Sequence, residues 1–166
     1  MKIYLISFGK LKTAGLRQTA DYYKKIIQPW VTLEEIELKP VTVSEKSAHA
    51  RNLILQQEEK ILLDHLSSKL KSRGLFFILD EKGKPRPSTK WAEDIQTLEL
   101  QGIPAIAYCI GSSLGFSPEF KKKAKDSISL GTHTMSHELA RVVLLEQVYR
   151  AYSIRNSHPY HNGDMR

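Results

Sequence analysis

The sequence lacks the marks of a secreted or membrane protein. Its single cysteine, Cys109, excludes an internal disulfide framework. No stretch approaches the ~18 uninterrupted apolar residues that a membrane helix needs. The opening MKIYLISFGKLK begins apolar but meets Lys10 and Lys12 too early for a signal peptide, and no small-residue cleavage site follows. We therefore expect a protein of the reducing cytoplasm.

Several chemical signatures are also missing. The glycines at 111 and 115 are followed by no Lys-Ser/Thr pair, which excludes a P-loop, and the segment lacks the third glycine and the downstream acidic residue of a dinucleotide fingerprint. His133 and His137 have no third ligand nearby, and His158 and His161 lie in a polar tail where histidine more often forms hydrogen bonds. The sequence thus predicts no metal site. Cys109 lies inside an apolar run, and we expect it to be a buried residue of the hydrophobic core, that is, core filler.

No repeat, low-complexity segment or linker divides the 166 residues, so we expect a single domain over 1–166. The 41% hydrophobic content is enough for a folded core. The net charge of +7 and the pI of about 9.4 favour a polyanionic partner such as RNA.

Short apolar runs alternate with amphipathic ones, the pattern of a mostly parallel sheet covered by helices. The expected strands are 2–8, 31–38, 74–79, 103–110 and 126–130. The expected helices are 15–28, 44–68 with Ser44 as cap and an apolar stripe of Leu53, Leu55, Ile61, Leu62 and Leu66, 88–100 with Ser88 or Thr89 as cap, one from about 117, and 137–154. We expect residues 80–87 to form a loop. On periodicity alone the prediction is a plain doubly wound sheet.

Ligands of open α/β sheets gather beyond the carboxyl ends of the strands, which here are followed by loops after Leu79, Ile110 and Leu130. The run Lys121, Lys122, Lys123 and Lys125 on the expected fourth helix is either a solvated face or an RNA contact. The tail at 155–166 is either an unstructured, floppy terminus or, given its His and Tyr side chains, a segment that binds single-stranded RNA.

Two C-terminal segments carry a family resemblance. Residues 140–154, ARVVLLEQVYRAYSI, and 158–161, HPYH, resemble the signature of the ribosomal RNA large subunit methyltransferase H family, and MKIYLISFGKLK is similar to that family's first strand. The resemblance implies a SPOUT fold: an α/β parallel sheet with helices on both faces and a C-terminal trefoil knot that binds S-adenosylmethionine. It also implies a homodimer built on the knotted helices. The final helix, apolar almost all round, fits such an interface.

The resemblance also assigns residues. The implied cofactor-binding residues are Leu79, Gly111, Ser112, Gly131, Thr132, His133, Thr134, Met135 and Ser136. The implied catalytic and RNA-binding residues are Arg141, Arg150, His158, Tyr160 and His161. Two positions depart from the family, which usually has a second glycine at Ser112 and a proline at Ser136.

The activity that the resemblance implies is transfer of a methyl group from S-adenosylmethionine to N3 of pseudouridine 1915 in 23S ribosomal RNA, with the assembled ribosome as the expected partner. His158 or His161 could serve as the base, and arginines could hold phosphate or developing negative charge. Two alternatives stay open: a non-catalytic RNA- or ribosome-binding protein on the same scaffold, and a SPOUT methyltransferase that acts on transfer RNA.

Overall fold

Five parallel strands form the centre of the molecule in the computed structural model, which describes residues 1–42 and 47–161. The strands are β1 (Lys2–Phe8), β2 (Thr32–Leu38), β3 (Leu75–Pro85), β4 (Ala105–Ile110) and β5 (Asp126–Ser129). They are arranged in the order β2-β1-β4-β3-β5, and every pairing is parallel. All five strands therefore end at the same edge of the sheet, and the predicted α/β class is confirmed.

The two inner strands β1 and β4 follow directly from their composition. All six residues of β4 are buried, and so are six of the seven in β1. A strand between two neighbours and under helices on both faces must be apolar on both sides, which is why these runs do not alternate with polar residues. Their positions were predicted correctly to within two residues.

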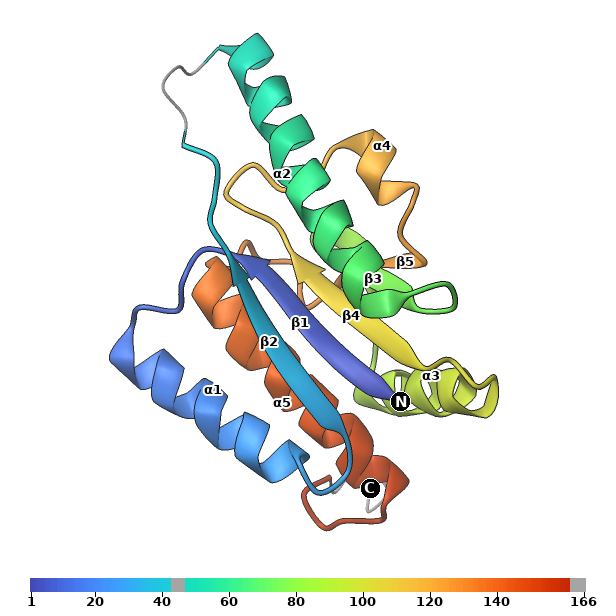
Figure 1. The fold of residues 1–166 in the computed structure, drawn as a ribbon. Helices are drawn as coiled ribbons and strands as arrows, with labels where there is room; N and C mark the ends of the chain where they lie inside the picture. Colours follow the sequence, from blue (N-terminus) through green and yellow to red (C-terminus); the bar gives the residue numbers. More distant parts are fainter. Residues whose placement is uncertain (43–46, 162–166) are drawn as a thin grey trace.

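Helices cover both faces of the sheet (Figure 1). The helices are α1 (Ala14–Ile27), α2 (Ala48–Leu70), α3 (Ser88–Leu100), α4 (Pro118–Lys121) and α5 (His137–Arg155). The core under α1, α3 and α5 contains Leu5, Ile106 and Tyr108, whereas the core under α2 and α4 contains Ile6 and Cys109. Helix α5 lies between α1 and α3 and contacts both. Cys109 is fully buried, in agreement with its reading as core filler.

Helix α2 begins later than the sequence indicates. The predicted cap, Ser44, lies outside the described residues, and Ser47 caps the helix by accepting a hydrogen bond from the Ala50 backbone N–H at 3.1 Å. The predicted apolar stripe is also partly wrong, because Leu53 is 45% exposed. The buried positions recur every four residues, as one helix face requires. They are Ile54, Glu58, Leu62, Leu66 and Leu70.

Strand β3 continues through most of the segment predicted to be a loop. Leu79 and Lys84 both stand opposite Ile128 of β5, so residues 80–83 bulge out of the ladder before pairing resumes. Gly83 permits this return, because a Cβ atom there would lie 2.7 Å from the Ile128 backbone. The loop prediction for 80–87 is therefore wrong for 80–85, which belong to β3, with 80–83 as a bulge in the strand.

Two further predictions are corrected at helix starts and ends. Pro87 precedes α3 without a side-chain cap, and Ser88 instead donates a hydrogen bond to Gln147 of α5 at 3.0 Å. Helix α4 ends at Lys121, so the remaining lysines of the basic run follow the helix rather than lie on it. The start of α4 near 117 is as expected, and Ser117 caps the helix by accepting from the Phe120 N–H at 3.1 Å.

None of the helices within 1–42 and 47–161 has the length and apolar character needed to cross a bilayer. The trefoil knot stays a prediction from the resemblance.

Because Gly83 lies so close to the Ile128 backbone, we predict that adding a methyl group at this glycine destabilises the protein. Gly83→Ala is expected to lower the free energy of unfolding by about 1–3 kcal/mol, because the backbone of β5 must shift to make room. Gly15→Ala is the control, since no atom lies within 4 Å of the added Cβ, and a helical alanine is expected to be neutral or stabilising. Urea denaturation measures both. Equal stabilities of the two variants would contradict the role given to Gly83.

Candidate active site

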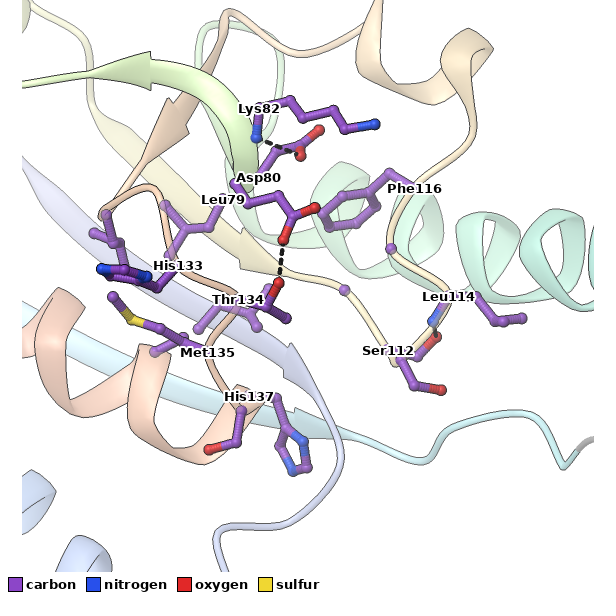
Figure 2. Close-up of a pocket in the computed structure, with 18 of the residues that line it drawn as sticks. Leu79, Asp80, Lys82, Ser112, Leu114, Phe116, His133, Thr134, Met135 and His137 are labelled. Carbon is purple, nitrogen blue, oxygen red and sulfur yellow. Dashed lines mark hydrogen bonds between the residues drawn. The ribbon is translucent and has the colours of Figure 1, made fainter.

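The bulge of β3 and the loops after β4 and β5 surround a cavity of about 610 Å³. Figure 2 shows side chains from these three segments and from the start of α5 around it. The walls combine apolar side chains such as Leu79, Leu114 and Met135 with polar groups such as Ser112 and Thr134. A volume of this size suits a nucleoside-sized ligand.

The structure gathers the residues implied as cofactor-binding into this one cavity. All of them except Thr132 line it: Leu79, Gly111, Ser112, Gly131, His133, Thr134, Met135 and Ser136. They come from β3 and from the loops after β4 and β5 and are separated by up to 57 positions in the chain, so their meeting depends on the strand order rather than on local sequence.

The bulge of β3 supplies a charged rim that the sequence reading missed. Glu81 accepts a hydrogen bond from the Thr134 hydroxyl at 2.6 Å and so joins the bulge to the loop before α5 (Figure 2). Asp80 forms an ion pair with Lys121 and accepts from the Lys82 backbone N–H at 3.1 Å. Partial burial opposes ionisation of Asp80, but these hydrogen bonds hold its pKa below the ordinary value. The rim therefore keeps a carboxylate beside two lysines at neutral pH.

The glycine loop after β4 turns tightly. A Cβ atom on Gly111 would lie 2.9 Å from the Gly115 carbonyl oxygen, and Gly115 has a φ of +71°, in the region that favours glycine. The Gly115 N–H donates to the Ser112 carbonyl at 3.0 Å and closes the turn. Both glycines are thus needed for the backbone path along the cavity wall.

The wall opposite the glycine loop is the start of α5. Ser136 caps the helix by accepting from the Leu139 N–H at 3.2 Å, a function that the proline usual in the family at this position cannot supply. His137 lines the cavity next to it. Gly9, which has a φ of +87°, packs against the His137 ring so closely that a Cβ atom would lie 2.8 Å from Nε2. The end of β1 therefore supports this wall.

Arg141 does not reach the cavity or the surface. Its side chain is 0% exposed and forms ion pairs with Glu35 at 3.1 Å and Glu37 at 2.7 Å, while it also donates to the Gly9 carbonyl. Burial opposes ionisation of Glu37, but hydrogen bonds from the Leu11 N–H, Arg141 and Arg17 outweigh it and lower its pKa to about 2. In this position Arg141 holds α5 to β2 and has no exposed surface for the RNA contact that the resemblance implied; its catalytic role stays a prediction.

The tail is docked as far as His161 rather than floppy. Tyr160 packs edge-on against Tyr149 at 4.7 Å between ring centroids, and the Arg150 guanidinium lies 4.7 Å from the Tyr160 ring centroid. The Tyr160 hydroxyl donates to Glu146 at 3.1 Å, and the His158 ring packs edge-on against Trp30. The rest of the predicted functional tail, 162–166, lies outside the described residues.

The structure places these tail groups together but far from the cavity. His158, Tyr160, His161 and Arg150 cluster at the C-terminal end of α5, whereas the cavity lies at its N-terminal end. Ala140 is the last residue of α5 that lines the cavity, and Arg150 lies ten residues further on, about 15 Å at 1.5 Å per residue. Tyr160 is also a poor base, because burial, the hydrogen bond with Tyr23 and the charge of Glu146 raise its pKa.

Within the described ranges, no three His, Cys, Asp or Glu side chains come together as a metal site would require. Sequence reasoning missed Asp80, Glu81, Leu114, Lys121 and His137 as cavity residues. For Asp80, Glu81 and Leu114 the available signal was a place just beyond an apolar run, and for His137 it was the expected helix start; nothing in the sequence distinguished Lys121 from its neighbouring lysines.

Comparisons with known proteins agree with this geometry. Residues 1–161 match the family described as predicted SPOUT methyltransferases. Proteins named ribosomal RNA large subunit methyltransferase H are similar over 97% of this chain and 99% of their own length, with 37% identity for the one from Bacillus cytotoxicus and 38% for the one from Oenococcus oeni.

Solved structures are similar in fold. A probable methylase family protein from Haemophilus influenzae has a TM-score of 0.55 at 13% identity, over 93% of this chain and 66% of that one. A putative methylase family protein from Neisseria gonorrhoeae has a TM-score of 0.51 at 11% identity, over 89% of this chain and 81% of that one. At these identities the likeness shows the fold alone.

The ion pair between Glu37 and Arg141 predicts a defined pH dependence. The pKa of Glu37 is lower in the folded state, so its stabilisation is present above about pH 4.5, the ordinary value, and is lost as the pH falls towards 2. Glu37→Gln is expected to lower the free energy of unfolding at pH 7 by on the order of 2 kcal/mol and to flatten its fall between pH 5 and 3. Denaturant titrations at each pH measure this. Parallel pH profiles for wild type and variant would contradict it.

Proposed function

The chain belongs to the SPOUT methyltransferase family and, within it, to the ribosomal RNA large subunit methyltransferase H family, and we propose that it methylates N3 of pseudouridine 1915 in 23S ribosomal RNA with S-adenosylmethionine as donor. The observation that carries the proposal is the cavity of about 610 Å³, into which three distant loops bring eight of the nine residues implied as cofactor-binding. We also propose that residues 1–166 act as one domain with a functional tail at 155–166, in a cytoplasmic homodimer whose substrate is the assembled ribosome.

The residues present suit S-adenosylmethionine. Backbone groups of the tight turn from Gly111 to Gly115 would hold its polar atoms, while Leu79, Leu114 and Met135 offer apolar surface to its adenine ring. When bound, it supplies an activated methyl group on a sulfonium, so the reaction needs no metal. Glu81 offers a carboxylate to a cationic ligand at the rim, whereas Asp80 is already paired with Lys121.

The protein's remaining tasks are to align the RNA base and to remove its N3 proton. In the transfer, the bond from N3 to the methyl carbon forms as the bond from that carbon to sulfur breaks, and the N3 proton passes to a base. If N3 titrates about two units above the ambient pH, exposing its anion costs about 2.7 kcal/mol. His158 or His161 as base, or Arg150 as a donor to the anion, would offset a cost of that size.

The position of the tail determines how these groups reach the reaction. About 15 Å of helix, the ten residues from Ala140 to Arg150, separates the cavity from the tail cluster of the same chain. In the proposed homodimer the tail of one subunit would therefore complete the cavity of the other. Arg141 would contribute indirectly, by holding Gly9 against the cavity residue His137.

Methyl transfer to ribosomes tests the proposed activity. With tritium-labelled S-adenosylmethionine and 70S ribosomes from a strain that lacks the enzyme, we expect label in the large-subunit RNA with the intact protein and none after truncation at Asn156. Bulk transfer RNA serves as the alternative substrate, and label there alone would support the transfer RNA enzyme. No label on either RNA and no calorimetric binding of millimolar S-adenosylmethionine would favour the non-catalytic binding protein.

Subunit complementation tests the assignment of the tail to the partner's cavity. The chain truncated after Asn156 keeps its cavity, and Gly111→Val blocks the cavity but keeps the tail; each is expected to be inactive alone. In an equal mixture, half of the dimers are mixed and each has one complete site, so we expect about a quarter of wild-type activity. An inactive mixture, with mixed dimers confirmed by mass spectrometry, would show that the tail does not act across the interface.

A further inference from the structure

The carboxyl group of Glu58 is buried behind the glycine loop. It belongs to α2, and the residue is only 2% exposed. Its two oxygens accept hydrogen bonds from the Val41 backbone N–H at 3.1 Å and from the Ser112 hydroxyl at 2.6 Å. No Lys, Arg or His among the described residues forms an ion pair with it. A charged residue type held in the interior by two neutral donors calls for a reason, because burial of such a group is costly.

Ser112 is the centre of the glycine loop. Its hydroxyl donates to Glu58 and also accepts from the Leu114 N–H at 3.3 Å, while its carbonyl accepts from the Gly115 N–H at 3.0 Å. The hydrogen bond to Glu58 therefore fixes a side chain on which the rest of the turn depends. It connects the loop to a helix on the other side of the cavity wall.

The next residue of α2 holds the other end of the same segment. Glu59 accepts a hydrogen bond from the Ser117 backbone N–H at 2.8 Å, directly before α4. Adjacent glutamates of one helix thus fasten the segment from Ser112 to Ser117 at both ends. Ser117 also caps α4, so the anchor includes the start of that helix.

A smaller cavity of about 170 Å³ lies beside the main one and explains where the Ser112 side chain goes. Glu58, Val41 and His137 line it, and Ser112 lines both cavities. A serine in place of the family's usual glycine would narrow the main cavity if its hydroxyl pointed inward. The hydrogen bond to Glu58 draws the hydroxyl toward α2 instead.

We propose that Glu58 is a positioning residue for the cofactor loop: it holds the Ser112 side chain against α2 so that the turn from Gly111 to Gly115 keeps its shape and its room for S-adenosylmethionine. The proposal rests on the proposed function for the identity of the ligand. The loop order that Glu58 imposes is a property of the ligand-free protein and is measured without it.

A double-mutant cycle tests the proposal. Glu58→Ala is made in the wild-type and in the Ser112→Gly backgrounds, and Asp64→Ala, an exposed carboxylate on the same helix, is the control. In the wild-type background we expect amide exchange at Leu114 and Gly115 to rise about tenfold and calorimetric affinity for S-adenosylmethionine to fall about tenfold. With Ser112→Gly the same change is expected to cost less than about twofold, because the hydroxyl that needs a partner is gone.

Equal losses in both backgrounds would overturn the proposal, since Glu58 would then act on the fold and not through Ser112. Unchanged exchange and affinity in the wild-type background would overturn it as well. Glu58→Gln covers the case in which the alanine variant does not fold: its amide oxygen can still accept from Ser112, so we expect losses smaller than about threefold. If the wild type binds no S-adenosylmethionine, the proposed function fails, and the exchange rates still decide the role of Glu58.

Discussion

The buried guanidinium of Arg141 fixes the helix on which the rest of the molecule's chemistry is arranged. It binds Glu35 and Glu37 of β2 and the Gly9 carbonyl after β1, and none of its surface reaches solvent. A buried charge that loses its partners costs several kcal/mol, so α5 has little freedom to slide or rotate on the sheet. Because α5 supplies the cavity wall at its start and carries the tail cluster on its second half, this one network sets the position of both.

The same network links the edge of the sheet to the cavity. Arg17 and Lys24 of α1 bind the same two carboxylates of β2, so α1 and α5 are held to one strand. Gly9 connects this network to the cavity. Its carbonyl accepts a hydrogen bond from Arg141, and it lies directly against the ring of the cavity residue His137. A substitution of Arg141, Glu35 or Glu37 would therefore alter the cavity wall through two direct contacts, from Arg141 to Gly9 and from Gly9 to His137.

The local pattern of apolar and polar residues predicts most of the strands and helices but few of the cavity residues. Strands β1 and β4 and helix α1 are visible in the sequence because their burial is set by their own periodicity. The continuation of β3 past Leu79 is not visible, since a charged segment with Gly83 reads as a loop until its pairing with β5 is known. The start of α2 was misplaced because Ser44 and Ser47 are equally good caps in isolation.

The site required knowledge that is not local. Family resemblance predicted a set of residues that the fold brings to one cavity, since it compares whole motifs, but it implied an RNA contact for Arg141, which is buried against β2. Neither the local sequence pattern nor the family resemblance identifies Glu58. In sequence it is one of two neighbouring glutamates on a polar helix, and only the contact with Ser112, 54 positions away, distinguishes it.

The outer surface of α5 has apolar residues that the proposed dimer interface would cover. Leu139 is 41% exposed, and Val142 and Val143 are only half-buried, so an apolar stripe runs beside the cavity. A stable interface needs roughly 800 Å² from each partner, more than three side chains on one helix can provide. In the proposed dimer the contact would extend along α5 to include the tail cluster around Tyr160. If two copies of α5 packed in opposite directions, such an interface would bring each tail towards the other subunit's cavity.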